Sequence, residues 1–203
     1  MLFRSAFLLG RAGKTAAPDA GSVAAAAEFP RDPDLKRVYR LLYNVVDGIA
    51  EDFATMDDLV KPLLAARPNY PEVVTVAAEL AQEFVTRGFD ITPARRAEAK
   101  RLTERAVQLA PDNPEALAAL GYYLYSTKTQ LGRAEESLRE AIRRKPQEPR
   151  FHCFLYQVLI ASNKQEAEIE AFATQLVEKF PSYAMAPFLI ASHYTGANGN
   201  LAT

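Results

Sequence analysis

The sequence is poor in the residues that carry covalent and metal chemistry. Its 203 residues include one cysteine, two histidines, no tryptophan and only nine glycines. A single cysteine, Cys153, excludes an internal disulfide and a cysteine-based metal site. So few glycines disfavour glycine-rich phosphate loops and turn-dense β architectures. We therefore expect a helical protein without a cofactor or a bound metal.

The chain also lacks a surplus of either charge and any long apolar run. Lys and Arg number 24 against 25 Asp and Glu, which gives a net charge of −1. A dedicated nucleic-acid binder needs excess cations to displace counterions, so the sequence predicts no nucleic-acid partner. No stretch reaches the roughly 18 apolar residues that a membrane span needs. With 49% hydrophobic and 24% charged residues, the composition is typical of a soluble folded protein.

The sequence does contain a regular series of prolines. Five of them are spaced 38, 43, 35 and 35 residues apart: Pro30, Pro68, Pro111, Pro146 and Pro181. A second proline follows each of the first four after three residues. The first proline ends a helix because it lacks an N–H, and the second is favourable in the first turn of the next helix. The spacing therefore predicts a tandem array of helix pairs.

Residues 114–126 and 132–145 form the clearest predicted pair. Apolar and small residues recur on one face of each helix: Leu117, Leu120, Gly121 and Leu124 in the first, and Ala134, Leu138, Ala141 and Ile142 in the second. Asn113 precedes Pro114 and is a favourable N-cap residue. The pair therefore predicts two amphipathic helices packed against each other.

This pattern resembles the tetratricopeptide repeat, a helix–turn–helix unit of 34 residues. The matching positions are Leu120-Gly121 in the first helix, Ala134, Leu138 and Ala141 in the second, and Pro146 after it. The resemblance implies an all-α fold, a right-handed α-solenoid of antiparallel helix pairs. It also assigns structural roles to six residues: Gly121, Ala134, Ala141, Pro111, Pro146 and Pro181.

The resemblance covers residues 30–196 and is strongest over 94–181. It predicts an N-terminal segment, 1–28, and a repeat domain, 29–203. The repeat units are expected at 33–68, 71–111, 114–146 and 149–181, followed by a terminal helix at 184–196. The second unit carries nine extra residues around 86–93.

The resemblance implies a function in protein–protein interaction. In this family the first helices of the units line a concave groove, which predicts a partner-binding surface at Tyr122, Tyr125, Arg150, Gln157 and Phe188. Tyrosine and arginine are favoured anchors in interfaces. The alternative for the tyrosines is that they cover neighbouring helices. We expect a non-catalytic scaffold that binds a peptide or a partner helix.

No catalytic constellation is evident in the sequence. His152 and Cys153 are adjacent, so on a helix they point about 100° apart and cannot form a thiol–imidazole pair. A lone cysteine on an apolar helix is usually a small buried hydrophobe. The acids Glu135, Glu136 and Glu140 stand among cations and indicate a solvated helix face. The sequence therefore predicts that the protein is not an enzyme.

The N-terminal segment and the last helix leave two questions open. Residues 1–18 contain Arg4, Arg11 and Lys14 without an acid, which is typical of an organelle transit peptide. We instead expect a docked or frayed helix of a cytoplasmic protein, with organelle targeting as the alternative. The last predicted helix has no partner helix, so another copy, segment 1–28 or a longer chain is expected to cover its apolar side. Self-association or complex assembly is thus the alternative function.

Overall fold

The computed structural model of the protein describes residues 29–44 and 48–194. Within these ranges the chain forms nine α-helices and no strand. They are α1 Pro33–Asn44, α2 Ala50–Ala66, α3 Pro71–Thr86, α4 Pro93–Leu109, α5 Pro114–Ser126, α6 Leu131–Arg144, α7 Pro149–Ala161, α8 Glu166–Lys179 and α9 Met185–Tyr194. The predicted all-α fold is confirmed. The predictions made for residues 1–28 and 195–203 lie outside the described residues.

Prolines punctuate the helices. The first backbone N–H of a helix has no partner within the helix, so a proline there costs no hydrogen bond. Five helices begin with a proline: α1, α3, α4, α5 and α7. The predicted cap of α5 is confirmed, because Oδ1 of Asn113 accepts hydrogen bonds from the backbone N–H groups of Glu115, at 2.8 Å, and Ala116, at 3.2 Å. Local sequence chemistry therefore fixes where the central repeat begins.

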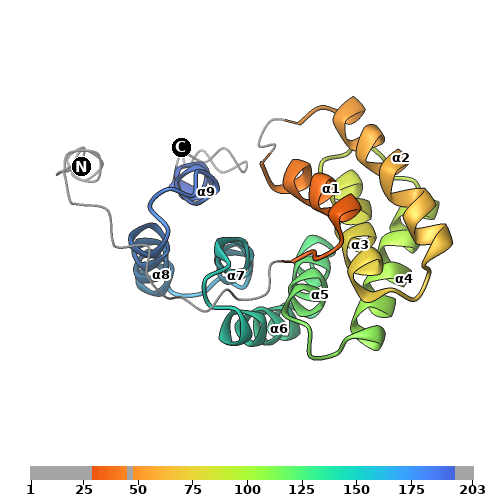
Figure 1. Ribbon diagram of the computed structural model, residues 1–203. Coiled ribbons are helices and arrows are strands. Elements are labelled where there is room, and N and C mark those ends of the chain that lie inside the picture. The colour runs from red at the N-terminus through yellow and green to blue at the C-terminus, as the bar shows by residue number, and fades with distance from the viewer. Residues whose placement is uncertain (1–28, 45–47, 195–203) are drawn as a thin grey trace, which may run out of the picture.

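The helices form a curved array, the solenoid that the repeat pattern predicts (Figure 1). Figure 1 shows α1, α3, α5, α7 and α9 along the inner side and α2, α4, α6 and α8 along the outer side. Successive inner helices pack closely against one another, whereas among the described helices the backbones of successive outer helices stay further apart. Closer spacing inside than outside bends the array, so the inner helices surround a concave side.

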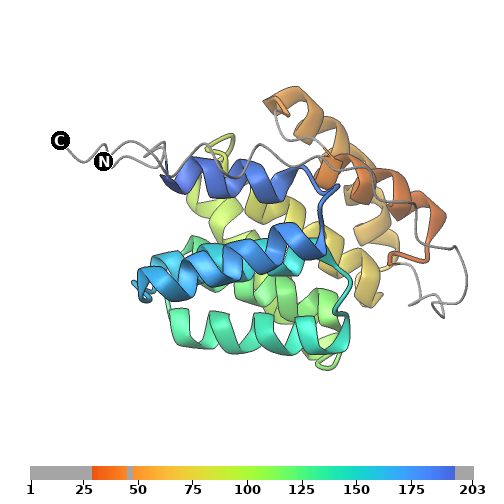
Figure 2. The ribbon, with the colours of Figure 1, turned by 90° about the vertical axis from the view of Figure 1, so that its left-hand side faces the viewer.

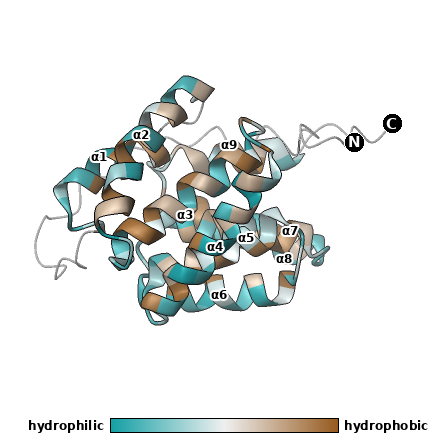
Figure 3. Ribbon diagram, turned by 90° about the vertical axis from the view of Figure 1, so that its right-hand side faces the viewer, coloured by the Kyte–Doolittle hydropathy of each residue, from teal (hydrophilic) through white to brown (hydrophobic). Residues whose placement is uncertain are grey.

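Small residues bring the two helices of the central pair together. An ideal Cβ atom on Gly121 of α5 would lie 2.5 Å from Cγ of Leu138 in α6. Ala134 and Ala141 on the facing side of α6 are fully buried. In Figure 3 polar and apolar residues alternate along the ribbons, as expected for helices that each bury one face. These three small residues therefore lie at the close contact between α5 and α6.

Longer helices take up most of the insertion in the second unit. Helices α3 and α4 have 16 and 17 residues, whereas α5 and α6 have 13 and 14. Arg95, near the start of α4, forms ion pairs with Asp57 of α2 at 2.9 Å and with Asp90 of the preceding loop at 3.1 Å. The extended end of this unit is thus tied back to the first unit.

Candidate partner-binding groove

A cavity of about 410 Å³ lies on the concave side of the array. Four of the five residues predicted for the partner-binding groove line it: Tyr122, Arg150, Gln157 and Phe188. They come from α5, α7 and α9, so the array brings three units together at one site. Tyr125 is absent from the lining and lies behind Tyr122, with the two rings stacked at 6.1 Å.

The Tyr122 ring forms one wall of the groove. It stacks on the ring of Phe154 from α7, with a centroid separation of 4.4 Å and an interplanar angle of 17°. Its hydroxyl oxygen lies 3.4 Å from Oγ1 of Thr86 in α3. Burial raises the pKa of Tyr122 well above its ordinary value, so the phenol stays protonated at neutral pH. The wall is therefore neutral, aromatic and held by packing on both sides.

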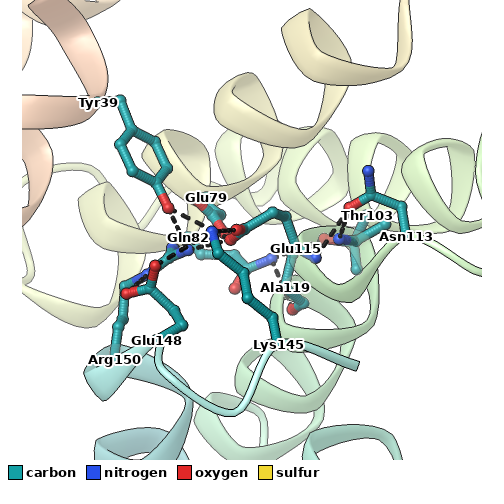
Figure 4. A network of polar contacts seen from close by, with 11 residues as sticks. Tyr39, Glu79, Gln82, Thr103, Asn113, Glu115, Ala119, Lys145, Glu148 and Arg150 are labelled. Carbon is teal, nitrogen blue, oxygen red and sulfur yellow. Dashed lines mark hydrogen bonds and ion pairs between the residues drawn. The ribbon is translucent and has the colours of Figure 1, made fainter. Parts of the chain in front are cut away.

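Arg150 lines the groove and is 2% exposed. Its guanidinium donates hydrogen bonds to Glu79 of α3, Glu115 of α5 and the hydroxyl of Tyr39 in α1 (Figure 4). Lys145, in the turn before α7, also donates to Glu115. One side chain thus connects four inner helices. Because its hydrogen bonds go to the protein itself, Arg150 acts on the groove as part of a rigid wall.

The other two predicted groove residues are more accessible. Gln157 is half-buried on α7, and the Phe188 side chain on α9 is 52% exposed. Near one end of the cavity, Nε of Arg87 lies 2.8 Å from Oε2 of Glu83. The groove therefore combines stacked aromatic rings, one amide that can donate and accept hydrogen bonds, and a charged pair.

Cys153 and His152 point to different sides of α7. Cys153 lines the groove but is only 2% exposed, and burial raises the pKa of its thiol to about 12. His152 faces the outer side, where its Nε2 lies 3.1 Å from the carbonyl oxygen of Pro146. The prediction that the two side chains diverge is confirmed. Within residues 29–44 and 48–194, no group of three His, Cys, Asp or Glu residues is placed to hold a metal ion.

Sequence reasoning missed Phe154, which supplies half of the aromatic stack. The repeat register assigns the groove to fixed positions of the first helix, and Phe154 falls beside one of them. The signal that could have found it is helical spacing, because Phe154 stands three residues before Gln157 and four after Arg150. The three side chains therefore share one face of α7.

Stacked helix pairs, a concave inner surface and small residues at the pair contacts define a tetratricopeptide-like helical repeat fold. No family model and no curated protein matches the chain. Among solved structures, it is similar to a thermophilic tetratricopeptide repeat protein of Thermus thermophilus, with a TM-score of 0.59 and 18% identity over 81% of this chain and 82% of that one. A mutant O-GlcNAc transferase of Thermobaculum terrenum is similar over 73% of this chain, with a TM-score of 0.53 and 20% identity.

The two likenesses carry different weight. The present chain spans 27% of the transferase's length but 82% of the Thermus protein's length. At identities near 20% they show the fold alone, and the fold agrees with the resemblance found in the sequence. None of the described helices combines the length and the apolar character needed to cross a membrane.

Proposed function

We propose that the chain is a non-catalytic scaffold that binds a peptide or a partner helix in its concave groove. One observation carries this proposal, the stack of Tyr122 on Phe154 beside a cavity of about 410 Å³. Aromatic side chains bury large areas and have few rotatable bonds, so they lose little conformational entropy when a ligand covers them. The groove therefore offers a preformed surface for apolar side chains of a partner.

The support around the groove favours the same function. The contacts of Arg150 to three other inner helices hold the wall in place before a partner arrives. Pre-organisation of this kind raises affinity because less order has to be created on binding. The side-chain amide of Gln157 can form hydrogen bonds with the backbone of a bound segment. Cys153 is protonated and buried, which supports a binding role for this surface and not a nucleophilic one.

Affinity capture with matched variants tests the proposal. The full chain is used as bait, together with Gln157→Ala/Phe188→Ser in the groove and a control, Gln108→Ala/Tyr70→Ser, on other faces. Both substitutions in the control variant replace side chains outside the cavity, and Tyr70 is 40% exposed. We expect the groove variant to lose a partner that the wild type and the control retain, with helix content unchanged. Retention of every captured partner by the groove variant would contradict the proposal.

A second candidate function is assembly through α9. Its sequence is apolar around most of its circumference, and Phe188 and Tyr194 are each 52% exposed. Light scattering on the wild type, on Tyr194→Ser and on a chain that begins at residue 29 tests this function. A larger mass in the wild type that falls to a monomer in one of the other chains supports assembly. A monomer in all three excludes it.

We also propose a cytoplasmic location, with organelle targeting through residues 1–18 as the alternative. A single buried thiol suits a reducing compartment, where disulfides are rare. A fluorescent protein fused after residue 203 reports the location. Import that is abolished by Arg4→Glu/Arg11→Glu would favour the alternative.

A further inference from the structure

A second cavity, of about 340 Å³, opens on the outer side of the array between α6 and α8. Figure 1 shows α7 between these two helices, and Figure 2 shows α6 and α8 from the side. The backbones of α6 and α8 stay apart, and α7 closes the bottom of the gap with His152 and Leu155. We call this gap the outer cavity. It faces away from the concave groove.

The floor of the outer cavity is apolar. Leu155 and Leu176 are almost fully buried, and Ile142 and Phe172 are half-buried beside them. Phe172 also stacks on the ring of His152, with a centroid separation of 6.4 Å and an interplanar angle of 27°. A large apolar side chain that binds here would move from water onto an existing apolar surface, and this transfer is favourable. The floor therefore suits a phenyl or a branched aliphatic group.

The rim of the outer cavity carries cations. Arg139, Arg143 and Lys179 line it, and no acidic residue is among the described residues of its lining. The Arg143 guanidinium donates to Glu140 at 2.6 and 2.7 Å, but Glu140 also accepts a hydrogen bond of 2.6 Å from Arg144. One carboxylate is thus shared by two guanidinium groups.

The same sharing occurs one turn earlier on α6. Glu135 pairs with Arg139 at 2.8 Å and with Lys164, from the turn before α8, at 3.2 Å. Glu135 therefore neutralises only one of its two cations, whereas Glu140 can neutralise Arg143 because Arg144 also pairs with Asp112 at 2.7 Å. Although the whole chain is nearly neutral, this rim has surplus positive charge.

Lys179 is the rim cation best placed for a new partner. Its Nζ atom lies 3.5 Å from Nε2 of His152, and the same Nε2 lies 3.1 Å from the carbonyl oxygen of Pro146. A carbonyl only accepts, so Nε2 carries the hydrogen and offers no lone pair to Lys179. The other contact of Lys179 within the described chain is the face of Phe180, at 5.3 Å. Its ammonium group therefore remains available to an anion.

We propose that the outer cavity is a second protein-docking site, which takes an acidic segment of a partner that carries a large apolar side chain. The apolar side chain enters between Leu155 and Phe172, while neighbouring carboxylates pair with Lys179 and Arg143. Charge complementarity and the apolar floor select this occupant together. A nucleic-acid backbone would match the rim but would leave the floor unfilled.

Fluorescence anisotropy with a labelled Glu-Glu-Phe-Glu-Glu peptide and the full chain tests the proposal. Two comparison peptides replace the phenylalanine by serine or the glutamates by lysine. We expect either comparison peptide to bind about tenfold more weakly or worse, because each lacks one half of the match. Salt at about 0.5 M should weaken binding of the acidic peptide, since ion pairs at a solvated rim are screened.

Variants of the chain locate the peptide. Arg143→Glu/Lys179→Glu should weaken binding about tenfold or more. The control, Lys100→Glu/Arg133→Glu, reverses two exposed cations outside the cavity and should stay within about twofold of the wild type. The groove variant Gln157→Ala/Phe188→Ser should also bind normally, so a failure here is distinguishable from a failure of the concave-groove proposal.

Several results would overturn the inference. They are the absence of wild-type binding, binding that Arg143→Glu/Lys179→Glu leaves intact, and loss of binding in the groove variant alone. A labelled single-stranded oligonucleotide is the last probe in the same binding assay. If it binds in place of the peptide, and the rim variant abolishes that binding, the cavity recognises nucleic acid and the protein-docking site is refuted.

Discussion

Nη1 of Arg150 lies 2.9 Å from Oε1 of Glu79, and this contact joins α7 to α3 across 71 residues of sequence. The same guanidinium also reaches Glu115, in the helix that lies between them. Both carboxylates and the arginine are almost fully buried. In a solenoid most contacts join neighbouring units, so a bond that skips a unit constrains the curvature of the array. The concave groove thus has its shape set partly by one buried ion cluster.

Arg150→Ala should destabilise the fold strongly. It removes the buried cation that Glu79 and Glu115 share, while Lys145 still pairs with Glu115. Removing one partner of a buried ion pair costs about 3–5 kcal/mol. Chemical denaturation followed by circular dichroism measures the loss of unfolding free energy. Adding Glu79→Gln and Glu115→Gln to the variant should recover part of the lost unfolding free energy, because neutral amides replace carboxylates that have lost a cation. A loss below about 1 kcal/mol in the single variant would show that the cluster is not a stabilising element.

Two glycines provide a matched test of helix packing. Gly121→Ala would place Cβ 2.5 Å from Cγ of Leu138 and 3.1 Å from the backbone oxygen of Ala134. We expect a loss of about 1–3 kcal/mol from overpacking, and a larger loss for Gly121→Leu. Gly132→Ala, on the facing helix, meets nothing within 4 Å and should gain up to about 1 kcal/mol from helix propensity. Equal thermal stability of the two alanine variants would contradict the close contact.

The sequence allowed the fold to be predicted because its signals are local. Prolines at helix starts, Asn113 at a cap and small residues at Gly121 and Ala134 each act within one unit. The partners of Arg150 lie 71, 35 and 111 residues away, and no local rule connects them. Arg150 was therefore expected as an interface anchor, whereas the structure places it inside an ion cluster. The outer cavity was missed for the same reason, because its rim and floor come from three helices.

Glu140 provides a prediction about pH. Hydrogen bonds from Arg143 and Arg144 lower the pKa of its carboxyl from 4.5 to about 2. A pKa lowered in the folded state means stability that is present above about pH 4.5 and is lost as the pH falls towards 2. The Tm of the wild type should therefore exceed that of Glu140→Gln near neutral pH, and the difference should shrink on acidification. A difference that stays constant down to about pH 2 would show that the carboxylate charge is not involved.

Cys153 should be unreactive in the folded protein. Its side chain is buried, and burial raises the pKa of its thiol to about 12, so the thiol stays protonated at pH 8. In the unfolded chain the thiol regains a pKa of about 8.5, and a sizeable fraction is ionised at the same pH. Labelling with an aromatic disulfide reagent should therefore be slow in buffer and fast in denaturant.

Arg150→Ala should speed the labelling of Cys153 in buffer, because a less stable fold opens more often. Fast labelling of the folded wild type would mean that the thiol is open to the concave groove, and that this surface is more accessible than its packing implies.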